Sequence, residues 1–269
     1  MAVFVLAVVL AVALGIGVGV LAWQTVLSTW RGALGPIALL ATICFSTAIF
    51  LKIATGIVTY RNERAAMEEG ALALYGRAST AKLHADVFRR LLSDPRMPAR
   101  ISALGLPASA PPEQRIMAVM QRGCAWLSDE QRAEAFEIRR ALAAASPEVC
   151  ASSWTGQGSP EALAPAMRTL DEDKQRAWIR IIARATELEL AANSAPARVS
   201  REARDAALME ILGAMSQDER AAFERASASQ KPTPEEACAG YRALSSGVMR
   251  VSPEAAALFR RIVFNPELI

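Results

Sequence analysis

Histidine and clustered cysteine are the scarcest chemical groups in this chain of 269 residues. His84 is the single histidine, and none of the four cysteines belongs to a Cys-x-x-Cys pair. These absences argue against a zinc site and against histidine-dependent catalysis, so we expect no metal and no cofactor. The residues around His84 are typical of an exposed helix face, on which the imidazole would be solvated.

Motifs for phosphate binding and for a serine nucleophile are also missing. Acidic pairs such as Asp129/Glu130 and Asp218/Glu219 lie in the first turns of predicted helices, where capping and the helix dipole explain them. We therefore expect a protein that is not an enzyme. An enzyme with an unrecognised carboxylate or cysteine site is the weaker alternative.

Acidic residues are absent from residues 1–59, which contain only two basic residues, Arg31 and Lys52. The rest of the chain has nearly equal numbers of acidic and basic residues, so no strong field attracts nucleic acid. Aromatic residues make up only 6% of the chain, whereas alanine, leucine, arginine and glutamate are abundant. This composition favours helices over a sheet core and predicts an all-α protein.

Two long apolar segments predict an N-terminal two-helix transmembrane hairpin over residues 1–60. Ala2–Ala22 has no charge, and as a helix rising about 1.5 Å per residue it would span roughly 30 Å of hydrocarbon. A cleaved signal peptide is the alternative, but no basic residue precedes this unusually long run. The second segment is Gly32–Tyr60. Residues suited to anchoring at the membrane interface flank or end the spans: Trp23, Trp30, Lys52 and Tyr60.

Small residues recur at every fourth position of the first segment: Ala7, Ala11, Gly15 and Gly19. Such a stripe allows another membrane helix to approach closely, and packing then stabilises the pair. The second segment of the same chain is the favoured partner. Homo-oligomerisation through this first helix is the alternative.

The charges beside the membrane predict its orientation. The connecting loop Gln24–Gly35 contains only Arg31, whereas Lys52, Arg61 and Arg64 lie at the far end of the second segment. The positive-inside rule then places both chain ends in the cytoplasm. We expect a protein of the bacterial inner membrane with a cytoplasmic soluble domain.

Helix starts are easy to recognise in the soluble part. Ser128, Ser216 and Thr233 each precede Gln or Glu by three residues, which predicts capping boxes. Residues 61–111 predict a juxtamembrane helix, over 61–94, followed by a proline-rich loop. Apolar residues at helical spacing continue through the rest of the chain and predict a multi-helix domain.

The soluble part resembles itself. In both Ser128–Cys150 and Ser216–Cys238, 22 residues separate a capping serine from a cysteine, and a phenylalanine lies between them. We interpret residues 112–192 and 200–269 as two tandem four-helix repeats that would stack through an apolar face. The alternative is that any two capped amphipathic helices look alike.

The cysteines allow two interpretations. In an oxidising compartment, Cys124–Cys150 would link adjacent helices, and the second repeat would lack this pair because Leu212 occupies the position of Cys124. In the cytoplasm, which we favour, the soluble-domain cysteines would be reduced core residues. Cys44 lies in a predicted membrane span.

These features predict a membrane-anchored helical interaction or scaffold protein whose partners are the membrane and another protein. Aromatic residues dominate interface hot spots, so the partner surface is expected near Trp126, Trp154, Trp178 and Tyr241. The alternative is an oligomeric membrane subunit, such as a pore, a holin-like protein or a secretion-system component.

Overall fold

The computed structural model describes residues 64–107, 109–155, 160–194 and 196–264. The chain divides into two compact units, Met1–Met67 and Glu68–Ile269, and every helix from α3 onward belongs to the second. Among the described residues, no helix combines the length and the apolar character needed to cross a membrane. The predicted hairpin lies outside the described residues, together with its packing and anchoring positions: Ala7, Ala11, Gly15, Gly19, Trp23, Trp30, Lys52 and Tyr60.

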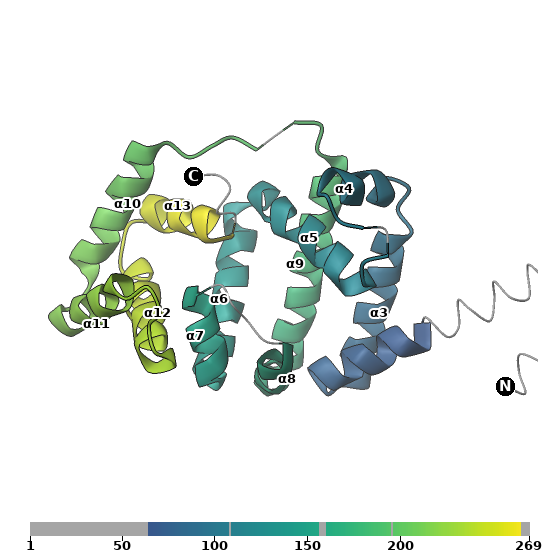
Figure 1. Cartoon of the computed structure of the whole chain (residues 1–269), viewed down its shortest axis with the longest axis horizontal. Coiled ribbons are helices and arrows are strands. Elements are labelled where there is room, and N and C mark those ends of the chain that lie inside the picture. Colours follow the sequence, from purple (N-terminus) through teal and green to yellow (C-terminus); the bar gives the residue numbers. More distant parts are fainter. Residues whose placement is uncertain (1–63, 108, 156–159, 195, 265–269) are drawn as a thin grey trace, which may run out of the picture. The chain divides into compact units, whose positions relative to one another are not determined.

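Helices are the only regular secondary structure in the described part of the chain, which contains no strand, and this confirms the all-α prediction there. A first helix covers 64–75, and the labelled helices follow (Figure 1). They are α3 (Ala78–Leu92), α4 (Met97–Ala103), α5 (Pro112–Gly123), the 3₁₀ turn η2 (Cys124–Trp126), α6 (Asp129–Ala145), α7 (Pro147–Thr155), α8 (Pro160–Thr169), α9 (Glu172–Ala191), α10 (Arg201–Ala214), α11 (Gln217–Ala228), α12 (Pro234–Val248) and α13 (Pro253–Phe264).

The predicted helix starts are confirmed. Ser128, Ser216 and Thr233 are the N-caps of α6, α11 and α12, and each forms a complete capping box. In α11, the Ser216 hydroxyl accepts from the backbone N–H of Glu219 at 3.2 Å. The Glu219 carboxylate in turn accepts from the backbone N–H of Ser216 at 2.8 Å. These reciprocal bonds satisfy two backbone donors that the helix itself leaves unpaired.

The region before α5 differs from the prediction in two places. The expected continuous helix over 61–94 breaks at Gly76, whose φ of 70° is accessible to glycine at little cost. The expected loop after it contains α4, which has proline in its first turn, where the missing N–H costs nothing. The interval 112–192 contains α5 to α9, one α-helix more than a four-helix repeat.

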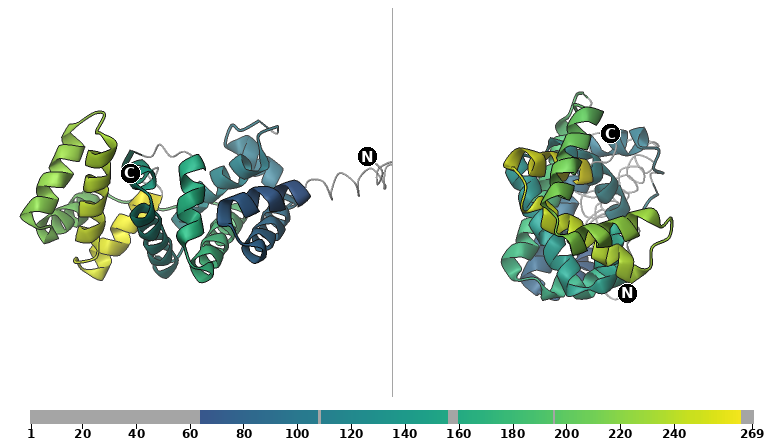
Figure 2. Two further views of the ribbon diagram at one scale, coloured as in Figure 1. Left: turned by 90° about the horizontal axis from the view of Figure 1, so that it is seen from below. Right: turned by 90° about the vertical axis from the view of Figure 1, so that its left-hand side faces the viewer.

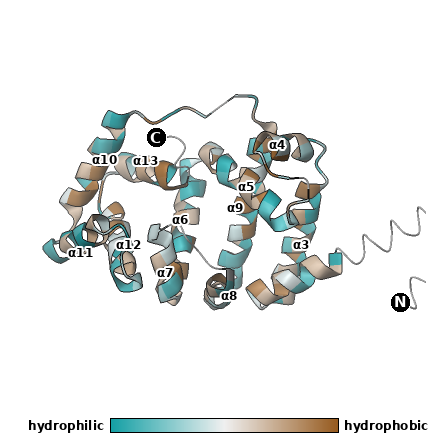
Figure 3. Ribbon diagram, in the orientation of Figure 1, coloured by the Kyte–Doolittle hydropathy of each residue, from teal (hydrophilic) through white to brown (hydrophobic). Residues whose placement is uncertain are grey.

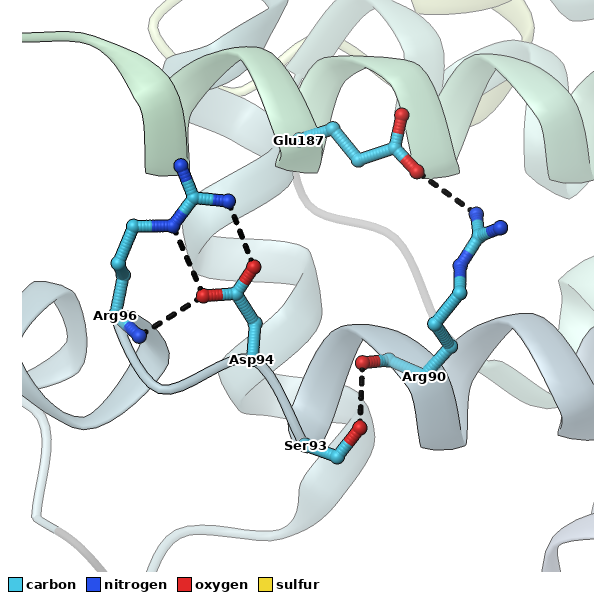
Figure 4. A network of polar contacts seen from close by, with 5 residues as sticks. All are labelled: Arg90, Ser93, Asp94, Arg96 and Glu187. Carbon is cyan, nitrogen blue, oxygen red and sulfur yellow. Dashed lines mark hydrogen bonds and ion pairs between the residues drawn. The ribbon is translucent and has the colours of Figure 1, made fainter.

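Helix α9 forms the centre of the larger core. It packs against α3, α5 and α6, and its buried residues include Ile179, Ile181 and Ala185. The helices α5 and α9 approach closely at Gly123, where an added Cβ would lie 1.9 Å from the carbonyl oxygen of Ala185. Figure 3 shows apolar and hydrophilic residues on the same helices, as expected of helices with one buried face. The exposed edge between α3 and α9 is polar, and there Arg90 pairs with Glu187 at 2.7 Å (Figure 4).

Helices α10–α13 form the other end of the 68–269 unit, opposite α3 and α4 (Figures 1 and 2). Helix α10 packs on α13, and α11 packs on α12. The contacts that join this group to the rest of the unit include α12 against α7, α13 against α6 and α13 against η2. A cavity lies at this junction.

Candidate functional site

A cavity of about 590 Å³ lies between α5, α6, α7, α9, α12 and α13. We call it the aromatic groove. Its lining is mainly apolar, and each of several helices contributes a large side chain: Met117 and Met120 from α5, Phe136 from α6, Trp154 from α7, Trp178 from α9, Tyr241 from α12, and Phe259 and Phe264 from α13. Ligand-binding sites in proteins usually have volumes of roughly 300–1,000 Å³ and mainly apolar linings.

Three of the four aromatic residues singled out from the sequence meet in this groove. Trp154, Trp178 and Tyr241 are far apart in the sequence and belong to three different helices. Trp126 does not line the groove. Its indole N–H donates to the Glu189 carboxylate at 3.1 Å, so it participates in a structural contact with α9.

Tyr241 lines the groove and has a buried hydroxyl without a hydrogen-bond partner among the described residues. The residue is only 7% exposed, and its Oη makes no hydrogen bond to any described residue. A buried hydroxyl without a partner costs roughly 1–3 kcal/mol, so most such groups are satisfied. An occupant that accepts a hydrogen bond from Tyr241 would remove this cost.

Arg139 places a positive charge at the same site. Its guanidinium lies 5.3 Å from the ring centre of Phe264, and both side chains line the groove. Within the described part of the chain, Arg139 has no carboxylate partner. Within the described residues, the groove therefore combines an apolar surface with one arginine that has no acidic partner.

Cys124 also lines the groove, as a free and buried thiol. Burial raises its pKa to about 11, although the nearby charges of Arg139 and Arg132 oppose the shift. The thiol is therefore protonated at neutral pH, and a protonated thiol is a poor nucleophile. Its contribution to the groove is a small apolar surface.

A second cavity, of about 580 Å³, shares Tyr241 and Ser245 with the aromatic groove. Three basic residues line it: Arg140, Lys174 and Arg242. Arg140 pairs with Glu137 at 2.9 Å and Lys174 pairs with Asp171 at 2.6 Å, whereas Arg242 has no acidic partner among the described residues. Tyr241 therefore lies between a mainly apolar cavity and a second cavity whose lining includes three basic residues and Glu137.

A disulfide lies beside the groove, and it differs both from the favoured prediction of reduced cysteines and from the alternative pair Cys124–Cys150. Cys150 is bonded to Cys238, with the two Cα atoms 4.9 Å apart. The reason is the orientation of α7, which turns Cys150 towards α12, whereas Cys124 faces the main core. Trp154 and Tyr241 follow the two bonded cysteines by about one helical turn, so the disulfide joins two walls of the groove.

The structure corrects the expectation for His84. The residue is 9% exposed, its ring stacks on Phe88 with centroids 3.8 Å apart, and its Nδ1 lies 3.1 Å from Tyr75 Oη. Burial lowers the pKa of His84 to about 4, so the imidazole is neutral at neutral pH. The sequence neighbours on its own helix gave no sign of the helix that covers it.

The groove is therefore suited to binding. The described residues that line it include no carboxylate and no histidine, and no described cluster of acidic residues, histidines and cysteines could hold a metal ion. Its lining combines aromatic and methionine side chains with Tyr241, whose hydroxyl has no partner among the described residues, and Arg139, which has no acidic partner among them. Comparison with protein-family models, curated proteins and solved structures found no match to this chain.

Proposed function

We propose that this protein is a non-enzymatic interaction protein, tethered to a membrane by residues 1–60, and that a partner protein binds in the aromatic groove. One observation carries the proposal: Trp154, Trp178 and Tyr241, from three helices, line a single cavity. Tryptophan and tyrosine contribute large areas of contact at little entropic cost, which is why they dominate interface hot spots. A groove between helices is also a common receptor for a partner helix.

The chemistry of the lining favours binding over catalysis. General acid–base catalysis needs a carboxylate, an imidazole or another group that titrates near the working pH. The described lining of the groove has neither a carboxylate nor an imidazole, and its thiol has a raised pKa. The remaining polar groups can orient an occupant and select its charge.

The disulfide supports an oxidising location for the 68–269 unit, such as the periplasm of a bacterium. Cys150 and Cys238 are both buried and bonded to each other, and such bonds persist in oxidising compartments, whereas the cytosol keeps thiols reduced. This proposal replaces the cytoplasmic side that the charge pattern predicts. That pattern depends on a difference of only a few charges near the membrane, so the disulfide is the stronger argument.

A photocrosslinking experiment tests the proposed groove. Met117 lies on the groove and is 41% exposed, whereas Met209 on α10 is 68% exposed and does not line it. Each methionine is replaced in turn by p-benzoylphenylalanine in the full-length protein, in its native host membrane. Irradiation should give a discrete crosslinked partner from position 117 and none from position 209.

Two results would contradict the proposal. Equal labelling from both positions would indicate non-specific contact, and no labelling at position 117 would indicate an empty groove. A crosslinked product with twice the mass of the chain would instead indicate self-association, as in the alternative of an oligomeric membrane subunit.

A further inference from the structure

The three arginines of α6 differ in whether an acidic residue of the same helix pairs with them. Arg132 pairs with Asp129 at 2.6 Å, and Arg140 pairs with Glu137 at 2.9 Å, each with an acid three residues earlier on the same helix. Arg139 has no such acid, because Phe136 occupies the position three residues before it. The helix therefore neutralises two of its cations locally, and the one that lines the groove has no acidic partner among the described residues.

Tyr241 supplies an independent unmet polar group at the same groove. The residue lines both cavities, and its hydroxyl is buried and has no partner among the described residues. Arginine can only donate hydrogen bonds, and a tyrosine hydroxyl donates readily to a carboxylate oxygen. Both groups can therefore be satisfied by an occupant that carries acceptor oxygens and negative charge.

The rest of the lining is suited to contact with apolar side chains of the occupant. Met117 and Met120 lie about one turn apart on α5 and line the same cavity as aromatic residues from α7, α9 and α13. Methionine side chains are flexible and polarisable, and surfaces that combine them with aromatic residues adapt to the apolar face of a bound helix. The part-exposed Met117 leaves this side of the groove open to a protein segment.

We infer that the aromatic groove binds an amphipathic segment of a partner protein that places apolar side chains against Trp154 and Trp178 and a carboxylate against Arg139. Tyr241 donates its hydroxyl to an acceptor of the same segment. This inference rests on the proposed function and adds the chemistry of the partner. A carboxylate side chain on a segment with apolar residues at positions i, i+3 or i+4 is the pattern that fits.

Selection from a library of random peptides of about 14 residues tests this chemistry. The full-length protein in nanodiscs serves as the bait, and the expected consensus combines apolar residues at helical spacing with at least one Asp or Glu. The affinity of one selected synthetic peptide is then measured for variants of the protein. Arg139→Met keeps the apolar stem but removes the charge, and it should weaken binding about tenfold or more.

The control and the second variant separate recognition from folding. Arg140→Met removes a neighbouring arginine that already pairs with Glu137, and it should leave peptide affinity within about twofold. Tyr241→Phe should weaken binding several-fold, and Arg139→Lys should restore part of the loss. Circular dichroism of each variant should match that of the wild type.

The outcomes that overturn this inference differ from those that overturn the proposed function. A consensus without acidic residues, or equal losses from Arg139→Met and Arg140→Met, would refute the acidic segment while a partner crosslink at position 117 kept the groove as an interface. Failure to select any peptide, with sodium oleate binding in an Arg139-dependent manner, would identify an anionic amphiphile as the occupant. That result would refute the inference as well.

Discussion

Cys150 on α7 is bonded to Cys238 on α12, and the two residues occupy equivalent places in the two proposed repeats. Contact between equivalent positions is the mark of an isologous arrangement, in which two similar units meet across a local two-fold axis. Units that stack by translation would bring different positions together. Here the contact between equivalent positions is limited to α7 and α12, because α6 packs on α13 whereas α11 has no comparable contact with α8 or α9 in the described part of the chain.

The disulfide should make the stability of the domain depend on reductant. It closes a long stretch of chain, with 88 residues separating the two cysteines. Restricting the unfolded chain in this way typically contributes about 2–5 kcal/mol. Dithiothreitol should lower the midpoint of thermal unfolding, followed by circular dichroism, in the wild type. The double variant Cys150→Ala/Cys238→Ala should start at the lower midpoint and not respond. An unchanged wild-type midpoint after complete reduction would contradict this prediction.

The side of the membrane can be measured directly. Alkaline phosphatase is active only where its own disulfides form, so a fusion after Ile269 should be active if the domain lies in an oxidising compartment. A green fluorescent protein fusion at the same position, exported in unfolded form, should stay dark. The reverse pattern would place the domain in the cytoplasm, as the charge pattern near the membrane predicts, and would mean that Cys150 and Cys238 are reduced there.

Gly123→Ala should be strongly destabilising. The added Cβ would lie 1.9 Å from the carbonyl oxygen of Ala185, which is backbone and cannot turn aside. The helices α5 and α9 would have to separate, at a cost of about 3 kcal/mol or more. Gly213→Ala on α10 is the matched control, because nothing lies within 4 Å of its Cβ position. That substitution should stabilise by about 0.5–1 kcal/mol in urea unfolding, and equal effects at the two glycines would contradict the close packing.

Features fixed by a few neighbouring residues could be predicted from the sequence. Each of the capping boxes at Ser128, Ser216 and Thr233 depends on two side chains and the backbone between them, so the local sequence is enough to predict it. The break at Gly76 could not be predicted from the sequence, because an isolated glycine is tolerated inside many helices. Only packing decides whether such a glycine takes a positive φ.

Features that depend on how helices turn towards one another could not be predicted. Equal spacing in Ser128–Cys150 and Ser216–Cys238 is visible in the sequence, but the bond between the cysteines requires α7 and α12 to pack together. The same limit applies to the groove. Trp126 and Trp178 look alike as candidate anchors, yet one contacts Glu189 and the other lines the cavity.

His84 should make stability fall in mild acid. Its pKa in the folded protein is lowered to about 4 from an ordinary value of 6.5, so between these pH values the unfolded chain binds the proton and the folded protein does not. The contribution is therefore complete above pH 6.5 and is lost as the pH falls towards 4, by an amount on the order of 3 kcal/mol. Urea unfolding at a series of pH values should show this slope in the wild type. His84→Phe, which keeps an aromatic ring beside Phe88, should flatten it, and an unchanged slope would contradict the prediction.

Glu187 and Glu189 lie two residues apart on α9, and their contributions to the free energy of unfolding should differ sharply. The Glu189 side chain is only 4% exposed, and its carboxylate accepts from Trp126 and lies 3.4 Å from Arg100 and 3.5 Å from Arg122. Glu187 is 41% exposed and makes a surface pair with Arg90 (Figure 4).

Removing the Glu189 carboxylate takes the acceptor from a part-buried indole N–H and removes a buried negative charge that lies near the guanidinium groups of Arg100 and Arg122. Glu189→Ala should therefore cost about 3 kcal/mol in urea unfolding, whereas Glu187→Ala should cost less than about 1 kcal/mol because water replaces an exposed pair. High salt should reduce the effect of Glu187→Ala further and change that of Glu189→Ala little, since buried charges are poorly screened. Equal costs for the two variants would show that the Glu189 cluster contributes no more than a surface ion pair, and Trp126 would then be free to return as a candidate for partner contact.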